Sequence, residues 1–457
     1  MDHTTVLYRM RKFFESGATR TCSFRREQLK KLKNSILQHE NELYDAMKAD
    51  LNKSPEETWI TENGMVIAEI NAALRGLNAW MEPESVPTNL LNLPSRSRII
   101  REPLGVVLVI GPWNYPFQLL VNPVVGAIAA GNCVVMKPSE VAGATAKVIH
   151  KIFETTFPTE YIYVIEGEGE KLIPPMMNNF RFDHVFFTGS QGVGKQIYKL
   201  AAEKLVPVTL ELGGKSPCVV EADANVQVAA RRIAVTKFSN AGQMCVAPDY
   251  VLVHQTIKKA FLDSLAATIK KFYGEKAEDC YNFGRIINEK QFDRLEKYLT
   301  QGEIYLGGKR QREKLFIEPT ILTNLSPEAA VMSEEIFGPI LPVIGFKEKQ
   351  EAKTIIQQHP DPLSFYIYTT SLDNEKYWLD AVPSGGACVN NSSWHLTNYH
   401  LPFGGRGGSG SGNYHGRYSF ETFSHRKAVM KTPNWFDPGI KYPPFKGKLK
   451  LFKKVLR

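Results

Sequence analysis

One cysteine and one glutamate stand where side chains can react with a carbonyl group. Cys245 lies between a predicted helix and a predicted strand, and Glu211 ends a predicted strand just before a Gly-Gly turn. A thiolate attacks carbonyl carbon, and a carboxylate can activate the water that later releases the product. No histidine stands beside either residue, so a Cys–His hydrolase is not favoured. We expect the cysteine to form a thioester that is used by something other than a Cys–His pair. The rest of the sequence suggests that a hydride acceptor takes part.

A glycine-rich turn, FTGSQGVGK, follows a predicted strand at residues 187–195. Glycines at such a turn let backbone N–H groups approach a phosphate, and the following helix N-terminus favours negative charge. The spacing of Gly189, Gly194 and Lys195 resembles a P-loop, but Gln196 stands where that loop needs a Ser or Thr for Mg²⁺. A dinucleotide site stays possible although the GxGxxG spacing is absent. A tight turn without a ligand is the simpler alternative.

Two further loops follow predicted strands, at the sheet edge where open α/β proteins bind ligands. In the loop PWNYP (112–116), the amide of Asn114 could donate to a developing oxyanion, or it could only shape a turn between two prolines. Lys137 and Glu140 could hold ribose hydroxyls. Alternatively, Ser139 caps a helix there, with Glu140 near the helix dipole.

The remaining motifs are weak when taken singly. The acidic pair in EEIFGP (334–339) is typical of a solvated turn, and PFGGRGGSGSG (402–412) is typical of a flexible loop. Their order along the chain is more informative than any one of them.

Composition limits the class of protein. A chain of 457 residues, 43% apolar and 23% charged, favours a soluble protein with two large lobes. Its six cysteines show neither CxxC nor metal-ligand spacing, so we expect reduced thiols, no metal site and a cytoplasmic protein. We also expect no secretory signal, because the N-terminal segment lacks an apolar run, and no run long enough to span a bilayer.

The net charge of +9 is concentrated at one end of the chain. Residues 441–457 carry seven basic side chains and no acidic one, which leaves +2 for the rest. The body therefore gives no electrostatic indication of nucleic-acid binding. In the tail, apolar residues among lysines predict a short cationic amphipathic helix that could touch an anionic membrane. A disordered tail, or one docked on a partner subunit, is the alternative.

The pattern of the chain predicts how the reactive residues are positioned. Residues 27–80 show helical periodicity, and a Pro-, Asn- and Ser-rich stretch follows residue 83. Short apolar strands then alternate with helices, which predicts a buried parallel sheet and a doubly wound α/β lobe, followed by a second βα region over 217–390. The predicted strands are Val106–Ile110, Cys133–Met136, Tyr161–Ile165, His184–Phe187 and Pro207–Leu210, and the predicted helices are Phe117–Ala130, Gly143–Phe157 and Gln191–Lys204.

At this point the sequence resembles the aldehyde dehydrogenases, and among them the short, class 3-like branch. The resemblance covers roughly residues 5–445, and its motifs are long and occur in the family's order. They are PWNYP (112–116), KPSE (137–140), FTGSQGVGK (187–195), LELGGKSP (210–217), GQMCVAPDY (242–250), EEIFGP (334–339), PFGG (402–405) and NYHGRYSFETFSHRK (413–427).

The resemblance implies an α/β fold of three parts and a basic tail. A Rossmann-like NAD(P)-binding domain would span 1–81 and 105–209, and an α/β catalytic domain 210–398. A bridging element of 82–104 and 399–432 would mediate a homodimer, and 433–457 would form the tail.

The resemblance also implies roles for individual residues in the NAD(P)-dependent oxidation of aldehydes to carboxylic acids. Cys245 would form a thiohemiacetal and then a thioester, Asn114 and the Cys245 N–H would stabilise the oxyanion, and Glu211 would activate the hydrolytic water. The predicted cofactor-binding residues are Trp113, Lys137, Glu140, Gly189, Ser190, Gly192, Val193, Gly194, Glu335 and Phe337. Whether the cofactor is NAD or NADP stays open.

The substrate site is predicted from a smaller set of residues. Tyr115, Trp394 and Phe403 would line the mouth, which favours medium-chain aliphatic or aromatic aldehydes. Two departures from the family pattern are Met244, before the nucleophile, and Arg406, in the glycine-rich loop. Arg406 would favour acidic aldehydes if it faced the mouth, but most single arginines are exposed.

Three other functions are disfavoured by the residues present. An acylating relative would pass the thioester to coenzyme A, but Glu211 favours hydrolysis by water. A P-loop ATPase is disfavoured by Gln196. A non-catalytic structural or membrane-coating protein on the same fold is disfavoured by the joint presence of Cys245, Glu211 and Asn114.

Overall fold

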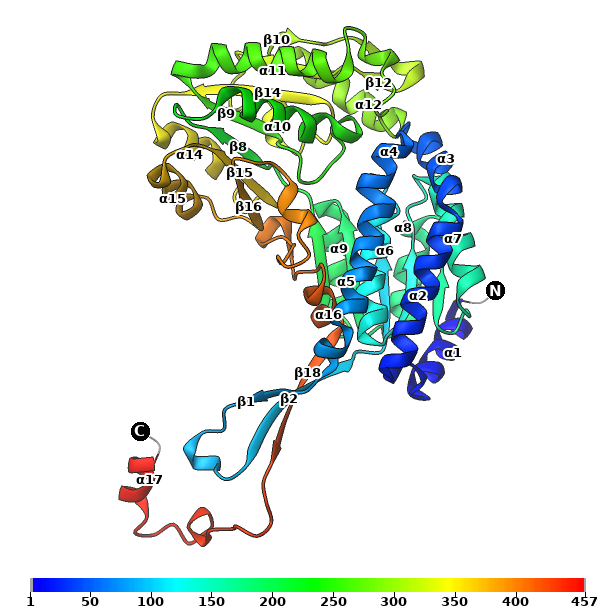
Figure 1. Ribbon diagram of the computed structural model, residues 1–457, viewed down its shortest axis with the longest axis vertical. Helices are drawn as coiled ribbons and strands as arrows, with labels where there is room; N and C mark the ends of the chain where they lie inside the picture. The colour runs from blue at the N-terminus through cyan, green and yellow to red at the C-terminus, as the bar shows by residue number, and fades with distance from the viewer. Residues whose placement is uncertain (1–2, 456–457) are drawn as a thin grey trace.

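Short buried strands build the first of two large sheets. A computed structural model describes residues 3–455 of the chain (Figure 1). The first sheet has the order β17-β7-β6-β3-β4-β5 and is parallel except for β17. Its strands are β3 (Val106–Ile110), β4 (Cys133–Lys137), β5 (Ile162–Val164), β6 (His184–Gly189), β7 (Val208–Leu212) and β17 (Gly410–Ser411). Every predicted strand of this lobe is confirmed to within two residues at each end.

Helices bury both faces of this sheet, which explains why its strands read as unbroken apolar runs. All five residues of β3 and of β4 are buried. The helices are α1 (His3–Glu15), α2 (Cys22–Gln38), α3 (Glu40–Leu51), α4 (Pro55–Thr58), α5 (Gly64–Met81), α6 (Gln118–Ala130), α7 (Gly143–Thr156), α8 (Gly169–Asn179) and α9 (Gln191–Ala202).

The second sheet forms a separate lobe with its own hydrophobic core (Figure 1). Its order is β10-β13-β14-β9-β8-β15-β16, and β10 is its antiparallel strand. The strands are β8 (Pro217–Val220), β9 (Tyr250–His254), β10 (Glu303–Leu306), β13 (Thr320–Thr323), β14 (Ile340–Phe346), β15 (Ser364–Tyr368) and β16 (Gly386–Val389). The helices around it are α10 (Val226–Phe238), α11 (Lys258–Tyr273), α12 (Glu289–Glu296), α13 (Ala330–Ser333), α14 (Lys349–Gln357) and α15 (Leu372–Ala381). The mixed α/β class with mainly parallel sheets is thus confirmed.

A slender arm extends away from both lobes (Figure 1). It is an antiparallel sheet of β1 (Glu84–Val86), β2 (Arg96–Pro103) and β18 (Ser424–Lys431), in that order, and the short helix α16 (Arg417–Thr422) leads into β18. After β18 the chain runs on to α17 (Leu449–Val455), in the segment where a short helix was one of the alternatives. The predicted tail residues Leu456 and Arg457 lie outside the described residues.

The glycine-rich run after residue 404 returns to the first sheet instead of forming a free loop. Gly410 pairs with Glu211 and Ser411 with Leu210. Gly410 has φ of 142°, and a Cβ there would lie 2.1 Å from the Leu210 carbonyl oxygen, so this pairing requires glycine. Strand β7, which carries Glu211, ends at Leu212, beyond the domain boundary predicted at residue 209. It pairs with β17, which lies in the segment predicted to bridge subunits.

No helix among residues 3–455 has the length and apolar character needed to cross a membrane.

Candidate active site

Cys245 lies on a turn between a 3₁₀ segment and strand β9, as the sequence predicted. The turn is held by the buried side chain of Gln243. Its Nε2 donates to the carbonyl oxygens of Asn240 at 3.0 Å and Arg285 at 2.9 Å. Its Oε1 accepts the Ile287 N–H at 3.0 Å. All the polar atoms of the Gln243 amide are thus used to fix the peptide that precedes the Met-Cys pair.

Glu211 is buried on β7 and faces the thiol. Its Oε1 lies 4.0 Å from the Cys245 Sγ, and its Oε2 accepts a hydrogen bond from the Thr188 hydroxyl at 3.2 Å. Thr188 is the register partner of Glu211 on β6. The parallel pairing of two strands therefore sets both the position and the orientation of the carboxyl group.

Burial raises the pKa of both reactive groups. For Glu211 the rise is opposed by the hydroxyl of Tyr414 and by His415. The pKa of the Cys245 thiol lies well above its usual range, first because of burial and then because of the carboxyls of Glu211 and Glu335. The resting thiol is therefore protonated at neutral pH, and Glu211 has an increased affinity for the proton that a thiol or a water gives up.

Asn114 approaches the cysteine turn from the other lobe. Its Nδ2 donates to the Gln243 carbonyl oxygen at 3.1 Å, and its side chain is buried. An amide nitrogen carries two hydrogens, so one is used to join the loops and the second is left for a group near Cys245.

An apolar cavity of about 400 Å³ opens on one side of the thiol. The predicted substrate residues Tyr115, Trp394 and Phe403 line it, and so does Met244. Trp394 is 55% exposed, as expected for a side chain at the mouth.

A polar cavity of about 640 Å³ opens on the other side. Five predicted cofactor residues line it: Trp113, Gly189, Ser190, Glu335 and Phe337. The Trp113 and Phe337 rings meet edge to face, with centroids 5.2 Å apart. The lining also includes charged side chains, among them Lys215, Arg294, Glu334 and Asp361.

The two cavities share Cys245, Glu211 and Leu119 in their linings. A molecule in either cavity can therefore reach the same thiol and the same carboxyl group. Asn114 lines the polar cavity at this junction.

The other predicted cofactor residues lie outside the polar cavity. Gly192, Val193 and Gly194 form the first turns of α9, where Val193 is exposed and a Cβ on Gly192 would meet nothing within 4 Å. Lys137 ends β4, and its ammonium pairs with the Glu140 carboxylate at 2.7 Å. This pair and the open start of α9 leave room for the far end of a dinucleotide.

The alternative prediction, that Ser139 caps a helix beginning directly after β4, is wrong. Helix α7 begins at Gly143, beyond Ser139. Its first N–H groups are capped by Asp50 from α3, which accepts from Ala144 at 3.1 Å and from Thr145 at 2.8 Å. Because the cap comes from a distant part of the chain, no local pattern could have indicated it.

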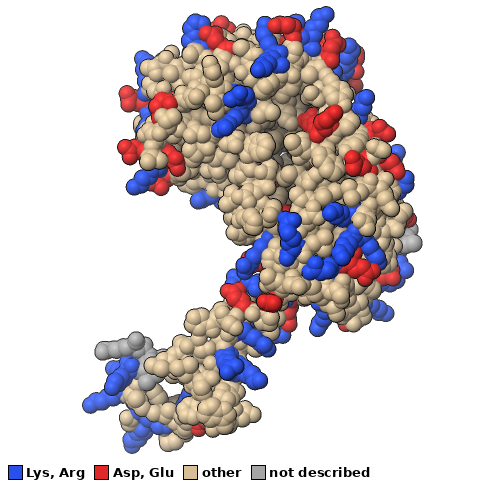
Figure 2. Space-filling view, in the orientation of Figure 1, with Lys and Arg blue, Asp and Glu red and all other residues tan. Residues whose placement is uncertain are grey.

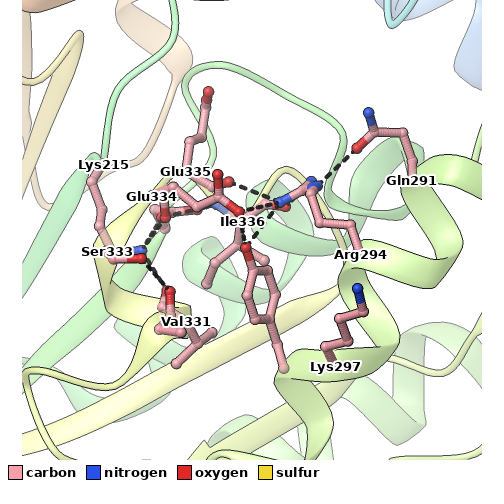
Figure 3. Close-up of polar contacts among 12 residues, drawn as sticks. Lys215, Gln291, Arg294, Lys297, Val331, Ser333, Glu334, Glu335 and Ile336 are labelled. Carbon is pink, nitrogen blue, oxygen red and sulfur yellow. Dashed lines mark hydrogen bonds and ion pairs between the residues drawn. The ribbon is translucent and has the colours of Figure 1, made fainter.

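A network of cations holds the segment that carries Glu335 and Phe337 (Figure 3). Arg294 donates to the carbonyl oxygens of Glu335 at 3.3 Å and Ile336 at 2.7 Å. Lys215 donates to the Glu334 carbonyl oxygen at 2.9 Å. Burial raises the pKa of the Glu335 carboxyl to about 8. Its Oε1 is a buried oxygen without a hydrogen-bond partner, and the residue is part of the lining of the polar cavity.

Arg406 lies on the side of the polar cavity. Its Nε is 2.7 Å from an oxygen of Asp361, which lines that cavity, and the Arg406 side chain is 55% exposed. It is absent from the lining of the apolar cavity, as expected for an exposed arginine.

Several residues of this site carried no separate prediction. Thr188 and His415 contact or face Glu211. Gln243 holds the turn that carries Cys245, and Arg294 holds the segment that carries Glu335. Gln243 and Thr188 stand inside quoted motifs and could have been found from them. Arg294 lies on α12 in a segment without any motif, and only its contacts indicate its role. Within residues 3–455, no group of three or more His, Cys, Asp or Glu side chains is placed to bind a metal ion.

Comparison with known proteins agrees with this arrangement. The model of the aldehyde dehydrogenase family matches residues 3–429. The chain therefore belongs to the aldehyde dehydrogenase family, and it is an oxidoreductase that oxidises aldehydes.

Its similarity extends over nearly the whole chain. It is 43% identical to the 4,4'-diaponeurosporen-aldehyde dehydrogenase of Staphylococcus aureus, over 98% of this chain and 97% of that one. It is 42% identical to aldehyde dehydrogenase family 3 member B1 of Homo sapiens, over 96% and 94%. The solved structure of Staphylococcus aureus AldH in a substrate-bound state matches with a TM-score of 0.97, 42% identity and 99% of both chains. The class 3 resemblance is confirmed.

Relatives with bound cofactors differ in the cofactor that they hold. GapN of Methanocaldococcus jannaschii was solved with NADP, and it matches with a TM-score of 0.84 and 25% identity over 94% of both chains. The AldA indole-3-acetaldehyde dehydrogenase of P. syringae was solved with NAD⁺, and it matches with a TM-score of 0.85 and 27% identity over 94% of this chain and 88% of that one. Aldehyde dehydrogenases of this fold thus bind NAD or NADP.

Proposed function

We propose that this enzyme oxidises medium-chain aliphatic or aromatic aldehydes to carboxylic acids with NAD or NADP, through a thioester at Cys245. The observation that carries the proposal is the position of Cys245 and Glu211 in the walls of both cavities. The apolar cavity suits the carbon chain of an aldehyde, and the polar one suits a nucleotide.

The residues at the junction perform the covalent steps. The Cys245 thiol gives its proton to Glu211, 4.0 Å away, as the sulfur adds to the carbonyl carbon. The second Nδ2 hydrogen of Asn114 and the N–H of Cys245 donate to the resulting oxyanion. When bound, the nicotinamide ring supplies the hydride acceptor that thioester formation requires. Once Glu211 has released the first proton to solvent, its carboxylate takes a proton from water as the water adds to the thioester, and it returns that proton to the sulfur as the sulfur leaves.

The polar cavity offers the groups that a dinucleotide needs. The unpartnered Oε1 of Glu335 fits a donor such as a ribose hydroxyl. Gly189 and Ser190 precede α9, whose N-terminus favours a diphosphate, and the Lys137–Glu140 pair lies where a second ribose would follow. Trp113 and Phe337 would flank the nicotinamide. Glu140 disfavours a 2′-phosphate by its charge, so NAD is expected to bind at least as well as NADP.

The test is cofactor reduction with three aldehydes. We expect wild-type enzyme to form NADH or NADPH with hexanal, decanal or benzaldehyde, and Cys245→Ser to lose turnover by about a thousandfold or more, as nucleophile removal does. Cys388→Ser is the matched control, because its half-buried thiol lines neither cavity and should leave turnover unchanged.

Two results would contradict the proposal. Wild-type turnover that appears only after coenzyme A is added would favour the acylating alternative. No turnover with or without coenzyme A would leave a binding or structural role for this chain.

We further propose that the enzyme is a homodimer. Strand β18 is the outer strand of the arm, and β16 is the outer strand of the second sheet. Such edges carry unpaired backbone N–H and C=O groups, which a second copy can satisfy. Light scattering should give twice the chain mass of 51.5 kDa, and a monomer mass at micromolar concentration would contradict it.

The tail supports a weak peripheral membrane contact on the cytoplasmic side. Trp435, Phe445 and Leu449 are more than half exposed, and lysines surround them without any acidic residue after Asp437 (Figure 2). Vesicles of phosphatidylserine and phosphatidylcholine should sediment the full chain better than a version ending at residue 440. Equal sedimentation of the two would contradict membrane contact and favour a tail that docks on the partner subunit.

A further inference from the structure

A fully buried ion pair lies behind the loop that carries Asn114. The Nζ of Lys53 and the Oε1 of Glu62 are 2.7 Å apart, and both side chains are 0% exposed. Lys53 precedes α4, and Glu62 lies in the π-helical segment Trp59–Asn63 that joins α4 to α5. Neither residue lines the apolar or the polar cavity.

Both members of the pair contact the loop between β3 and α6. Lys53 donates to the Asn114 carbonyl oxygen at 3.3 Å, and its Nζ lies 3.9 Å from the centroid of the Tyr115 ring. Glu62 uses its other oxygen to accept the N–H groups of Phe117 at 3.2 Å and Gln118 at 2.8 Å. One ion pair therefore fixes this loop at four points.

The same loop is joined to the cysteine turn on its opposite side. The Asn114 carbonyl oxygen accepts a second hydrogen bond, from Asn240 Nδ2 at 2.8 Å. The Asn114 side chain donates to the Gln243 carbonyl oxygen at 3.1 Å. The peptide of Asn114 is thus held between the Lys53 ammonium and the turn that carries Cys245.

The energetics favour a positioning role for this pair over a stabilising one. Removing two charges from water is expensive, and a buried ion pair is often no more stable than two apolar side chains of similar volume. Burial raises the pKa of Glu62, and this rise is opposed by the Lys53 ammonium and by the two N–H groups that Glu62 accepts. What the pair provides is a set of directed contacts, and directed contacts fix a reacting group to within a fraction of an ångström.

We propose that Lys53 and Glu62 are positioning residues for thioester formation, which act by holding the Asn114 amide in line with the oxyanion. The proposal rests on the oxyanion role proposed for Asn114. It assigns a function in catalysis to two N-terminal residues that touch neither substrate nor cofactor.

The kinetic signature follows from where the pair lies. Loss of the pair lets the Asn114 loop shift, so the first turnover, in which the thiohemiacetal and thioester form, becomes slower. Hydrolysis of the thioester passes through an oxyanion on the same oxygen, so it slows as well. Neither Lys53 nor Glu62 lines the polar cavity, so cofactor binding changes much less. A misplaced group of this kind lowers a rate by about tenfold to a hundredfold.

The experiment measures the single-turnover rate of NADH or NADPH formation in Lys53→Met and Glu62→Gln. We expect both variants to lower this rate by about tenfold or more, with a much smaller change in the Kd for the cofactor. Glu62→Gln keeps the shape of the side chain, so it serves if Lys53→Met does not fold.

Arg25→Met is the matched control for lost stability. Arg25 is also buried, and it donates to the carbonyl oxygens of Thr19 and Ala129 at 3.0 Å, at the far end of α6 from the Asn114 loop. It should lower Tm as the other variants do, yet keep the single-turnover rate per folded molecule.

A double variant tests whether the pair acts through Asn114. In an Asn114→Ala background, Lys53→Met should lower the single-turnover rate by less than about twofold, because residues that act as one unit are not additive.

Two results would overturn the proposal. The first is that Lys53→Met and Glu62→Gln both keep a single-turnover rate per folded molecule as high as that of Arg25→Met. The other is a full additional loss on top of Asn114→Ala. A failure of the proposed function itself is distinguishable, because wild-type enzyme would then show no aldehyde turnover at all.

Discussion

The two cavities that meet at Cys245 differ in chemistry and in the way they are built. The apolar one is walled by helices and loops, with side chains such as Leu119, Trp394 and Phe403. The polar one is walled by segments that follow strands β3, β6 and β7, by α12 and by the segment after α13, with charged groups such as Lys215 and Glu335. A nucleotide is bound where many backbone groups and charges converge, whereas an alkyl chain needs only a surface without polar atoms.

This difference explains the state of the reactive groups. The apolar side removes water from the thiol, and the polar side places the carboxyls of Glu211 and Glu335 near it. Both effects raise the pKa of Cys245. The junction therefore holds a protonated thiol beside a carboxyl with an increased proton affinity, which suits transfer of a proton as the sulfur reacts.

The largest loss of rate is expected for Glu211→Gln, at the junction of the two cavities. The thioester should still form, although more slowly, because the thiol must then lose its proton to water. Hydrolysis should slow further, because no carboxylate activates the attacking water. We expect a burst of about one NADH per active site and a steady-state rate lowered by about 10²- to 10⁴-fold. The steady-state rate of wild type should also fall as pH drops below the raised pKa of Glu211, because only the carboxylate accepts a proton.

Glu221→Gln is the matched control for this variant. Glu221 is equally buried, accepts a hydrogen bond from the Trp378 indole at 2.6 Å and lines neither cavity. If Glu211→Gln abolished the burst as well as the steady state, proton removal from the thiol, and not hydrolysis, would be the main role of Glu211.

The next test lies in the polar cavity and depends on pH. Glu335 has its pKa raised to about 8, so its carboxylate predominates only above that pH. A carboxylate accepts a hydroxyl hydrogen bond more strongly than a carboxylic acid does. The Kd for the cofactor should therefore fall as pH rises from 7 to 9, and Glu335→Gln should bind about tenfold more weakly at pH 9.

The Glu335→Gln variant also shows which group causes the pH dependence of the cofactor Kd. Burial lowers the pKa of the nearby Lys237 to about 8 as well. A pH dependence that persists unchanged in Glu335→Gln, measured by quenching of protein fluorescence, would belong to Lys237 and contradict the role of Glu335.

A smaller effect is expected at the mouth of the apolar cavity. Trp394→Ala removes apolar surface from the path of a long chain, at about 0.8 kcal/mol for each methylene that loses its contact. The KM for decanal should rise about fivefold to tenfold, and that for hexanal should change less. Trp435→Ala, which removes a more exposed tryptophan from the tail, is the control. An equal rise for both aldehydes would show that Trp394 does not contact the distal part of the chain.

The smallest effect is expected at Arg406, at the rim of the polar cavity. Its ion pair with Asp361 is exposed, so Arg406→Ala should lower the free energy of unfolding by less than about 1 kcal/mol. The KM for aldehydes should not change. Arg417→Ala removes an ion pair with the same exposure, from Glu421, and is the control for stability. A change in aldehyde KM above fivefold would place Arg406 in the wall of the apolar cavity.

Much of the fold and the centre of the site could be predicted because their signals are local. Strand β3 reads VVLVI because both of its faces are covered, and Cys245 and Glu211 stand in long motifs. The supporting contacts could not be predicted in this way. Asp50 caps a helix that begins 93 residues later, and Lys53 reaches a carbonyl oxygen 61 residues away.

The sequence by itself determined the parallel sheets and the family and indicated the two residues proposed to react, because strand burial and motif order are written in neighbouring residues. Only the tertiary structure decided that two unlike cavities share one thiol, that Gly410 pairs with the strand of Glu211, and that Lys53 and Glu62 lie behind Asn114. These arrangements depend on which distant segments pack together, and packing is decided by the burial of whole elements and not by spacing along the chain.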